Sequence, residues 1–342
     1  MRFPFFSLRR IGAGVLAAAA LLVAQMPAAR AATEVRVGFI PVAGIGQLFV
    51  IDGEGWAREA GIELKLTQFE SGPAMISALA SGTLDAYYGG IGPILVSSAR
   101  GIPVKAVAAT AIEELALVGR GDIARLQNAA SAEGFKAFVA AQGRPVKIAT
   151  QPPGSVPDTV LRYWLQKVAK VDPKHYQIVP MGIEQTQQAL LAGAVDVATV
   201  REPALTVVLD RDPGTKLLVR GGTMQTDQPG SVLALHGAFR ERSPEAAVAL
   251  LKLHVRATEL LRKEPKRAAV HLHKGLGKGL TDLATFERAL VSPASNYVSD
   301  PSRIKVPTGV MQDFQVELGV LKEVADLDKV FDEAFYRAAL AK

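Results

Sequence analysis

The chain has 342 residues, of which 49% are hydrophobic and 21% charged, as is typical of a globular protein with a substantial core. It contains no cysteine, which excludes disulfides, thiolate metal sites and cysteine nucleophiles. Its net charge of +6 comes mostly from four arginines among the first 31 residues. The remainder carries 35 basic and 33 acidic residues and gives no support for nucleic-acid binding.

Residues 1–31 have the order of an export signal. A basic start that includes Arg9 and Arg10 precedes the apolar run 11–24, and the segment ends in the small-residue cleavage pattern Ala-Arg-Ala. The run is shorter than the about 20 residues that span a membrane. We therefore expect cleavage after about Ala31 and a soluble periplasmic protein. The paired arginines leave both the general secretory and the twin-arginine route open.

Strand and helix patterns alternate along the rest of the chain. Short apolar or alternating runs predict strands at 34–40, 62–69, 84–88, 104–110, 114–119, 146–150, 176–181, 195–200 and 215–220. Periodic apolar faces predict helices at 73–81, 131–142, 156–169 and 182–192. From Ser243 onward the pattern is almost wholly helical, with Ser243 as a cap before Pro244. This order indicates an α/β fold with mainly parallel sheets.

One sequence pattern occurs twice in the chain. "ALASGTLDAYYGGIGP" (78–93) and "ALLAGAVDVATVREP" (189–203) both read Ala-Leu-x-x-Gly-x-x-Asp, then a short strand and a Pro-terminated loop. The pattern describes a helix, a glycine cap, a tight turn and a strand whose far end opens a loop. Ligands of open α/β sheets bind at that end of the strands. We expect two similarly built lobes; coincidence between two units is the alternative.

Several stretches in a fixed order resemble one family. "VRVGFIP", "SGPAMISALASGTLDAYYGGIGP", "QPPGSVPDTVLRYWL" and "QALLAGAVDVATVREPAL" are similar to the periplasmic substrate-binding proteins of ABC importers in the nitrate, sulfonate, taurine and thiamine-pyrimidine group. With their neighbours they cover most of residues 34–270. The closing segment of the chain resembles the family's closing helices more loosely.

The resemblance implies an α/β, two-lobed periplasmic binding protein of type II. Lobe one would comprise 34–118 and 230–342 and lobe two 119–229, with two crossing segments as the hinge. A small-molecule ligand would bind in the cleft between the lobes, and the lobes would close on it. The resemblance further implies the membrane permease of an ABC importer as partner, a monomer, and no cofactor.

Two helix starts are candidates for binding the ligand's polar groups, and their residues are Ser71, Gly72, Gln151, Gly154, Ser155 and Asp158. Free N–H groups and the positive helix end favour an anion there. Plain helix capping is the alternative, since Ser155 and Asp158 also fit a capping box.

Arg201 and Glu202 follow the expected strand 195–200. The planar fork of Arg201 suits a carboxylate or a sulfonate, so we expect a small organic ligand with one acidic group. Asp158 or Glu202 then meets a donor elsewhere on the ligand. Alternatively, Glu202 pairs with Arg201 or with a surface lysine.

Further cleft residues are expected where strands end, namely Phe39, Pro41 and Gly90. Strand alternation sends Tyr87 and Tyr88 to opposite faces, so one of them is core; we take Tyr88 as the cleft candidate. The polar loop Ser295–Tyr297 is a weaker candidate.

The sequence offers no catalytic or metal-binding set. The five histidines are scattered, and "PPGSVPD" lacks the second glycine of a G-x-S-x-G elbow. We therefore expect a binding protein that captures a small organic acid, of sulfonate or carboxylate type, for an ABC importer. The alternatives are a binding protein for a neutral heterocyclic vitamin precursor, a sensory binding module and, less favoured, an exported enzyme on the same scaffold.

Overall fold

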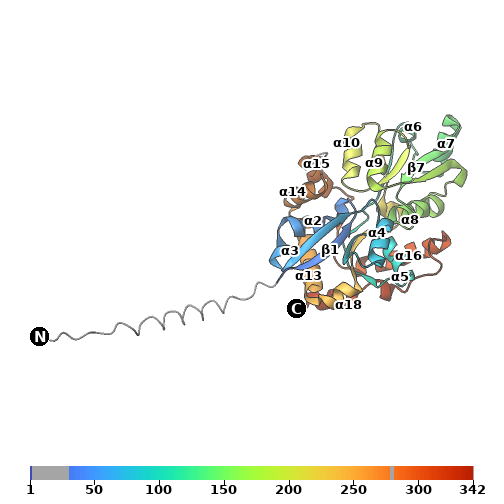
Figure 1. Cartoon of the computed structure of the whole chain (residues 1–342). Coiled ribbons are helices and arrows are strands. Elements are labelled where there is room, and N and C mark those ends of the chain that lie inside the picture. The colour runs from blue at the N-terminus through green and yellow to red at the C-terminus, as the bar shows by residue number, and fades with distance from the viewer. Residues whose placement is uncertain (2–30, 278–280, 342) are drawn as a thin grey trace. The chain divides into compact units, whose positions relative to one another are not determined.

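The computed structural model describes Met1 and residues 31–277 and 281–341 (Figure 1). The predicted export signal therefore lies almost wholly outside the described residues. From Thr33 on, the contacts form one compact unit, which contains two five-stranded sheets and a two-stranded one.

The sheet of lobe one has the strand order β2-β1-β3-β11-β4. Its strands are Ile62–Gln68 (β2), Thr33–Phe39 (β1), Ala86–Gly90 (β3), Ser231–His236 (β11) and Val104–Ala109 (β4). β1 is parallel to β2 and β3, whereas β11 is antiparallel to β3 and β4. The carboxyl ends of β1, β3 and β4 and the start of β11 therefore lie at one edge of this sheet.

The sheet of lobe two has the order β10-β6-β9-β7-β8. Its strands are Lys216–Arg220 (β10), Ala116–Gly119 (β6), Val197–Val200 (β9), Val146–Thr150 (β7) and Tyr176–Pro180 (β8). β7 is parallel to β8 and β9, and β6 is antiparallel to β9 and β10. Here the carboxyl ends of β7, β8 and β9 share an edge with the start of β6.

Helices cover both sheets. In lobe one they are η1 (Ala43–Ile45), α2 (Gly46–Gly53), α3 (Trp56–Glu59), α4 (Gly72–Ala80) and α5 (Ile91–Ala99). In lobe two they are α6 (Asp122–Arg125), α7 (Ala132–Gln142), α8 (Val156–Tyr163), η2 (Trp164–Val168), η3 (Pro173–His175), α9 (Ile183–Leu191), α10 (Ala204–Arg211) and α11 (Gly221–Met224). The predicted helix 156–169 is thus an α-helix that continues as a π-helical turn.

The last third of the chain is helical, as its apolar period predicts. Its helices are α12 (Gly237–Arg242), α13 (Pro244–Lys263), α14 (Pro265–Leu276), α15 (Leu283–Leu290), α16 (Ser302–Glu317), α17 (Leu327–Val330) and α18 (Glu333–Leu340). Pro244 does open α13, but Ser243 makes no side-chain cap, because its backbone (φ −141°, ψ 58°) differs from that of a capping serine. The long helix α13 packs on α2 of lobe one.

Two segments cross between the lobes, at 110–115 and 225–230. They are bonded to each other, since the N–H of Glu113 donates to the carbonyl of Gln228 at 2.9 Å. Glu113 and Asp227 both have a φ of 51°, in the left-handed region that non-glycine residues rarely adopt. The chain divides here between β5 (Ala111–Ile112), which lies outside the predicted strands and pairs with β12 (Asn296–Tyr297), and β6, which is the observed part of the predicted strand 114–119 and joins the second sheet.

This division bears on the predicted lobe limits. Because β6 pairs with β9 and β10, the first crossing precedes residue 116, ahead of the predicted limit at 118–119. The second crossing ends at β11, next to the predicted limit at 229–230. The limits themselves stay a prediction.

The repeated unit has the same geometry in both lobes. Gly82 and Gly193 have φ values of 68° and 70°, and the residue after each donates to a carbonyl five residues earlier, as in a Schellman motif. The Asp85 carboxylate then accepts from the backbone N–H of Arg36 at 3.0 Å, and that of Asp196 from the N–H of Lys147 at 2.9 Å. The two lobes are therefore built on one local plan.

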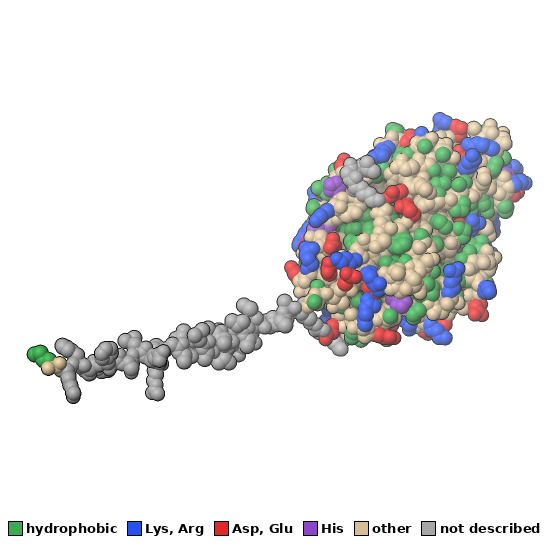
Figure 2. All heavy atoms as spheres, viewed as in Figure 1, with side chains coloured by type: hydrophobic (Ala, Val, Ile, Leu, Met, Phe, Trp, Pro, Cys, Tyr) green, Lys and Arg blue, Asp and Glu red, His purple; other side chains and the backbone are tan. Residues whose placement is uncertain are grey.

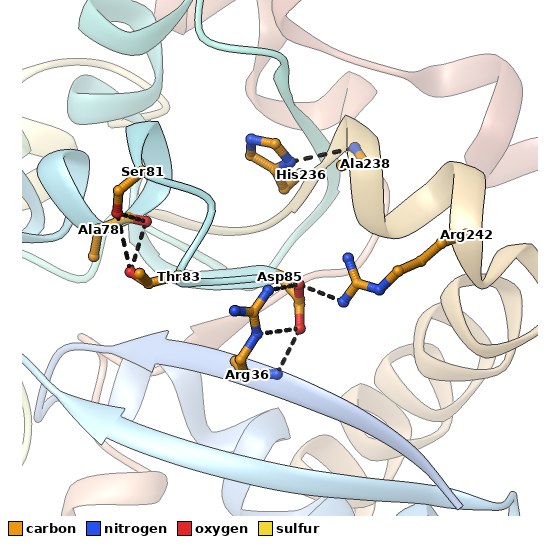
Figure 3. A network of polar contacts seen from close by, with 8 residues as sticks. All are labelled: Arg36, Ala78, Ser81, Thr83, Asp85, His236, Ala238 and Arg242. Atoms are coloured by element: carbon orange, nitrogen blue, oxygen red, sulfur yellow. Dashed lines mark hydrogen bonds and ion pairs between the residues drawn. The ribbon is translucent and has the colours of Figure 1, made fainter.

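These aspartates also bind arginines. Figure 3 shows Asp85 between Arg36 and Arg242, whose Nη2 atoms donate at 2.7 and 2.6 Å. Asp196 accepts two hydrogen bonds from Arg144 at 2.6 and 2.8 Å. Both carboxylates lie at the start of their strand, so they fix the helix-to-strand turn at the edge opposite the crossing segments.

Acidic and basic side chains are interspersed over the face of the molecule shown in Figure 2, rather than gathered by sign. None of the described helices combines the length and the apolarity that crossing a membrane requires.

We predict that Asp85→Asn lowers the free energy of unfolding by about 2 kcal/mol at pH 7, because a buried carboxylate loses charge-assisted hydrogen bonds. Burial opposes ionisation of Asp85, but the bonds from Arg36 and Arg242 outweigh it and lower its pKa. Its stabilisation is therefore complete above the unfolded pKa and is lost as the pH falls through the folded one. Denaturant unfolding of both proteins from pH 7 to pH 3 should show the difference shrinking.

The matched control is Asp196→Asn. That side chain is 14% exposed, against 2% for Asp85, so its loss should cost less. An Asp85→Asn penalty that stays constant down to pH 3 would contradict the assignment.

Candidate functional site

The candidate site lies where the facing edges of the two sheets meet the crossing segments. Arg201 directly follows β9, Ser231 opens β11, and Glu114 lies in the first crossing segment. Strand direction alone brings these three residues, from three distant parts of the sequence, to one place. With the helix starts at Gly72 and Val156 they form what we call the interlobe site.

Glu114 is the centre of the interlobe site. Its Oε1 accepts from Ser231 Oγ at 2.6 Å and from Arg201 Nη1 at 3.4 Å. Glu114 is 2% exposed and Arg201 6%, so both charges are withdrawn from water. The 3.4 Å separation exceeds the usual range for such a bond, and the pair is therefore held loosely.

The second oxygen of Glu114, Oε2, is buried and has no hydrogen-bond partner among the described residues. It fits only because residue 44 is glycine, since a Cβ there would lie 1.6 Å from it. A Cβ at Gly230 would lie 3.0 Å from Oε1. The backbone thus leaves room for a carboxylate whose hydrogen-bonding capacity is only partly used.

Two helix starts flank this carboxylate and arginine. Ser71 Oγ accepts from the N–H of Ala74 at 3.4 Å, and Ser155 Oγ from the N–H of Asp158 at 3.3 Å. Both serines therefore cap their helices. Pro73 and Pro157 stand at the second helical position and have no N–H.

Backbone N–H groups without an acceptor among the described residues remain at both of these helix starts. The backbone N–H groups of Gly72 and Val156 have no acceptor within the described part of the chain. These two donors are available to an anion or another acceptor.

Glycines bring the second lobe against the β3–α5 turn. A Cβ at Gly92 would lie 2.6 Å from the carbonyl oxygen of Gly154, and one at Gly90 would lie 2.9 Å from a methyl of Val156. Gln315 of α16 adds a bond from Nε2 to Thr159 Oγ1 at 3.1 Å. The lobes are therefore in direct contact beside the interlobe site.

The structure gives the two tyrosines different surroundings. Tyr88 is fully buried in lobe one, where its hydroxyl lies 3.1 Å from His254 Nδ1. Tyr87 is also buried, and burial raises its pKa, with Arg201 and Glu114 acting on it in opposite directions. Its hydroxyl donates to the Gly90 carbonyl at 2.8 Å and lies beside Gly72. We therefore take Tyr87, in place of Tyr88, as the tyrosine of the candidate interlobe site.

The two other acids expected near the ligand have partners of their own. Asp158 forms only half of the expected capping box. Its backbone N–H donates to Ser155 Oγ, but its carboxylate accepts from Arg162 Nε at 2.8 Å instead of from the backbone N–H of Ser155. Burial raises the pKa of Asp158, and Arg162 opposes this. Glu202 Oε2 accepts from the N–H and the hydroxyl of Thr206 at 3.1 and 2.8 Å.

Neither expected pairing of Glu202, with Arg201 or with a lysine, is found among its described contacts. Burial raises its pKa, and hydrogen bonds from Ser292 and Thr206 oppose that shift. Its backbone carbonyl accepts from the N–H of Ala43 across the lobes at 2.7 Å. Glu202 thus holds the start of α10 and connects the lobes.

Most of the remaining sequence candidates have partners of their own. Phe39 packs edge-on against Phe49, Pro41 is half-buried after β1, and Gln151 donates to Thr186 at 3.1 Å. The loop Ser295–Tyr297 lines a cavity of about 590 Å³ beside the crossing segments, together with Glu113 and Asp227. Tyr297 also donates to the Ala43 carbonyl at 3.1 Å.

Sequence reasoning missed Glu114, Ser231 and Gly44. A signal for the first was present: Glu113 and Glu114 interrupt the stretch from Ala106 to Val118, whose other residues are apolar except Thr110. A charge inside such a run is rarely buried without a partner. Ser231 and Gly44 carry no comparable signal.

Comparison with known proteins supports the assignment of the fold. The model of the NMT1-like family matches residues 28–272. A Bacillus subtilis protein that is assigned to aliphatic sulfonate binding is 26% identical over 313 residues, 90% of this chain and 88% of that protein.

Solved structures agree with this match. The periplasmic nitrate-binding protein NrtA from Synechocystis has a TM-score of 0.78 and 17% identity, over 91% of this chain and 89% of that one. The alkanesulfonate-binding protein SsuA from Xanthomonas axonopodis, bound to MOPS, has a TM-score of 0.68 and 17% identity, over 87% and 98%. The predicted two-lobed periplasmic binding protein fold and the predicted resemblance are confirmed.

We predict that Gly92→Ala weakens ligand binding at least about tenfold while the free energy of unfolding changes by about 1 kcal/mol or less. The added methyl meets the Gly154 carbonyl only when the lobes touch, so each lobe still folds. The control is Gly309→Ala in α16, where a Cβ would make an ordinary 3.6 Å contact. Equal affinities in calorimetric titration, with the ligand found by thermal-shift screening, would contradict this role.

Proposed function

The chain belongs to the NMT1-like family, and we propose that it is the periplasmic solute-binding protein of an ABC importer, taking its ligand at the interlobe site. Binding rather than catalysis is supported by its relatives, which are named for the binding of sulfonates or nitrate. The membrane permease of the importer is the proposed partner, and the protein is proposed to act as a monomer.

The ligand that the site supports best is a small organic acid of sulfonate or carboxylate type. The observation that carries this proposal is the buried guanidinium of Arg201, whose contact to Glu114 is long at 3.4 Å. A bidentate anion can bind such a planar group more closely than Glu114 does. The N–H groups of Gly72 and Val156 supply further donors.

The proposed ligand-binding residues come from both lobes. Arg201 and Val156 belong to lobe two, whereas Gly72, Tyr87 and Ser231 belong to lobe one. A ligand that contacts both sets favours the conformation in which the lobes touch, by as much as its affinity differs between open and closed forms.

A neutral heterocyclic ligand is the second candidate. It is favoured by one observation, the pairing of Arg201 with Glu114, which leaves the two side chains with no net charge. A neutral ligand with both donors and acceptors would meet this pair without burying an unpaired charge.

A thermal-shift screen of the mature chain tests the proposal. Small sulfonates, carboxylates and neutral vitamin precursors are compared, because ligand at 100 times its Kd stabilises a protein by about 2.7 kcal/mol. We expect acids to raise the melting temperature. A response to neutral heterocycles alone would replace the acid by the second candidate.

We further predict that Arg201→Met lowers the free energy of unfolding by about 3 kcal/mol, because Glu114 is left buried without its counter-charge. The double variant Arg201→Met, Glu114→Gln should recover most of that loss, and both variants should bind the acid at least about tenfold more weakly. Chemical denaturation and calorimetric titration measure the two effects. Normal affinity in the double variant would exclude Arg201 as the anion-binding group.

A further inference from the structure

One property of the Glu114 carboxylate plays no part in the proposed function. Its Oε2 is buried, lies against Gly44 and has no hydrogen-bond partner among the described residues. A buried acceptor without a donor is costly, and more so when it is charged. The other oxygen is shared between Ser231 and a distant Arg201 nitrogen.

Glu114 changes which acids the site can hold. Nitrate and unsubstituted alkanesulfonates have acceptors only, so beside Arg201 they would also lie beside a carboxylate that repels them. An acid that carries an N–H or O–H donor on a short link would instead give Oε2 its missing partner. The positive charge of Arg201 and the negative charge of Glu114 would thus match an acidic group and a donor group on one ligand.

Glu114 is better placed for this than the other acids. Asp158 also has an unpartnered oxygen, but Arg162 on the same helix satisfies its charge at 2.8 Å. Glu202 is occupied by Thr206. Of these three acids, Glu114 is the one paired with Arg201, the proposed binding group for the ligand's acid.

We propose that Glu114 is a specificity-determining residue that selects acids bearing a hydrogen-bond donor, an ammonium group above all, near the acidic group. Arg201 takes the acid and Glu114 Oε2 takes the donor. The inference rests on the proposed function, because it assumes that an acid binds at Arg201.

Matched ligand pairs test this inference with the mature chain. Taurine is compared with ethanesulfonate, and β-alanine with propanoate, by calorimetric titration; the members of each pair differ in the amino group alone. We expect the amino member to bind at least about tenfold more tightly. In Glu114→Gln, whose amide can donate to a plain acid, this preference should disappear or reverse.

A second variant guards against effects on folding. Gly44→Ala keeps every charge but forces the carboxylate away from its position, so it should reduce the same preference while both proteins melt cooperatively. Equal binding of both members by the wild type, or an unchanged preference in both variants, would overturn the inference alone. Failure of all four acids to bind the wild type would contradict the proposed acid ligand as well.

Discussion

The carboxylate of Glu114 connects the parts of this protein that must act together. It lies on a segment that crosses between the lobes, accepts a hydrogen bond from Ser231 of lobe one and pairs with Arg201 of lobe two. Removing two charges from water is costly, and the pair is favourable only while both partners remain in place. Glu114 therefore contacts both lobes through the same carboxylate that sets the charge balance at the interlobe site.

Strand direction explains why the interaction can form. In both sheets the parallel strands end at the edge from which the crossing segments leave, so loops far apart in sequence face each other. The opposite edge of each sheet is fixed by an aspartate, Asp85 or Asp196, bound to the backbone of a neighbouring strand. Each lobe thus has one end fixed by its aspartate and another that faces the other lobe.

Much of the architecture followed from local pattern. Apolar period and glycine position predicted most strands, the two copies of the helix-turn-strand unit and the location of Arg201 at a strand end. The site was less predictable, because its bonds join distant residues: Glu114 and Arg201 are 87 positions apart. Alternation separated Tyr87 from Tyr88 but could not say which faces the core, since helices cover the sheet on both sides. The role of Asp158 was not predictable either, because its carboxylate could bind the helix start or Arg162, one turn further along the same helix, and it binds Arg162.

Pro73 and Pro157 bear on how the proposed ligand would be captured. Each restricts the backbone at the start of a helix and removes an N–H, and the N–H groups of Gly72 and Val156 directly precede these prolines. A ligand bound there as proposed would meet a backbone that is already ordered, so little conformational entropy would be lost. Differences in affinity between the proposed ligands would then be expressed mainly in how long each stays bound.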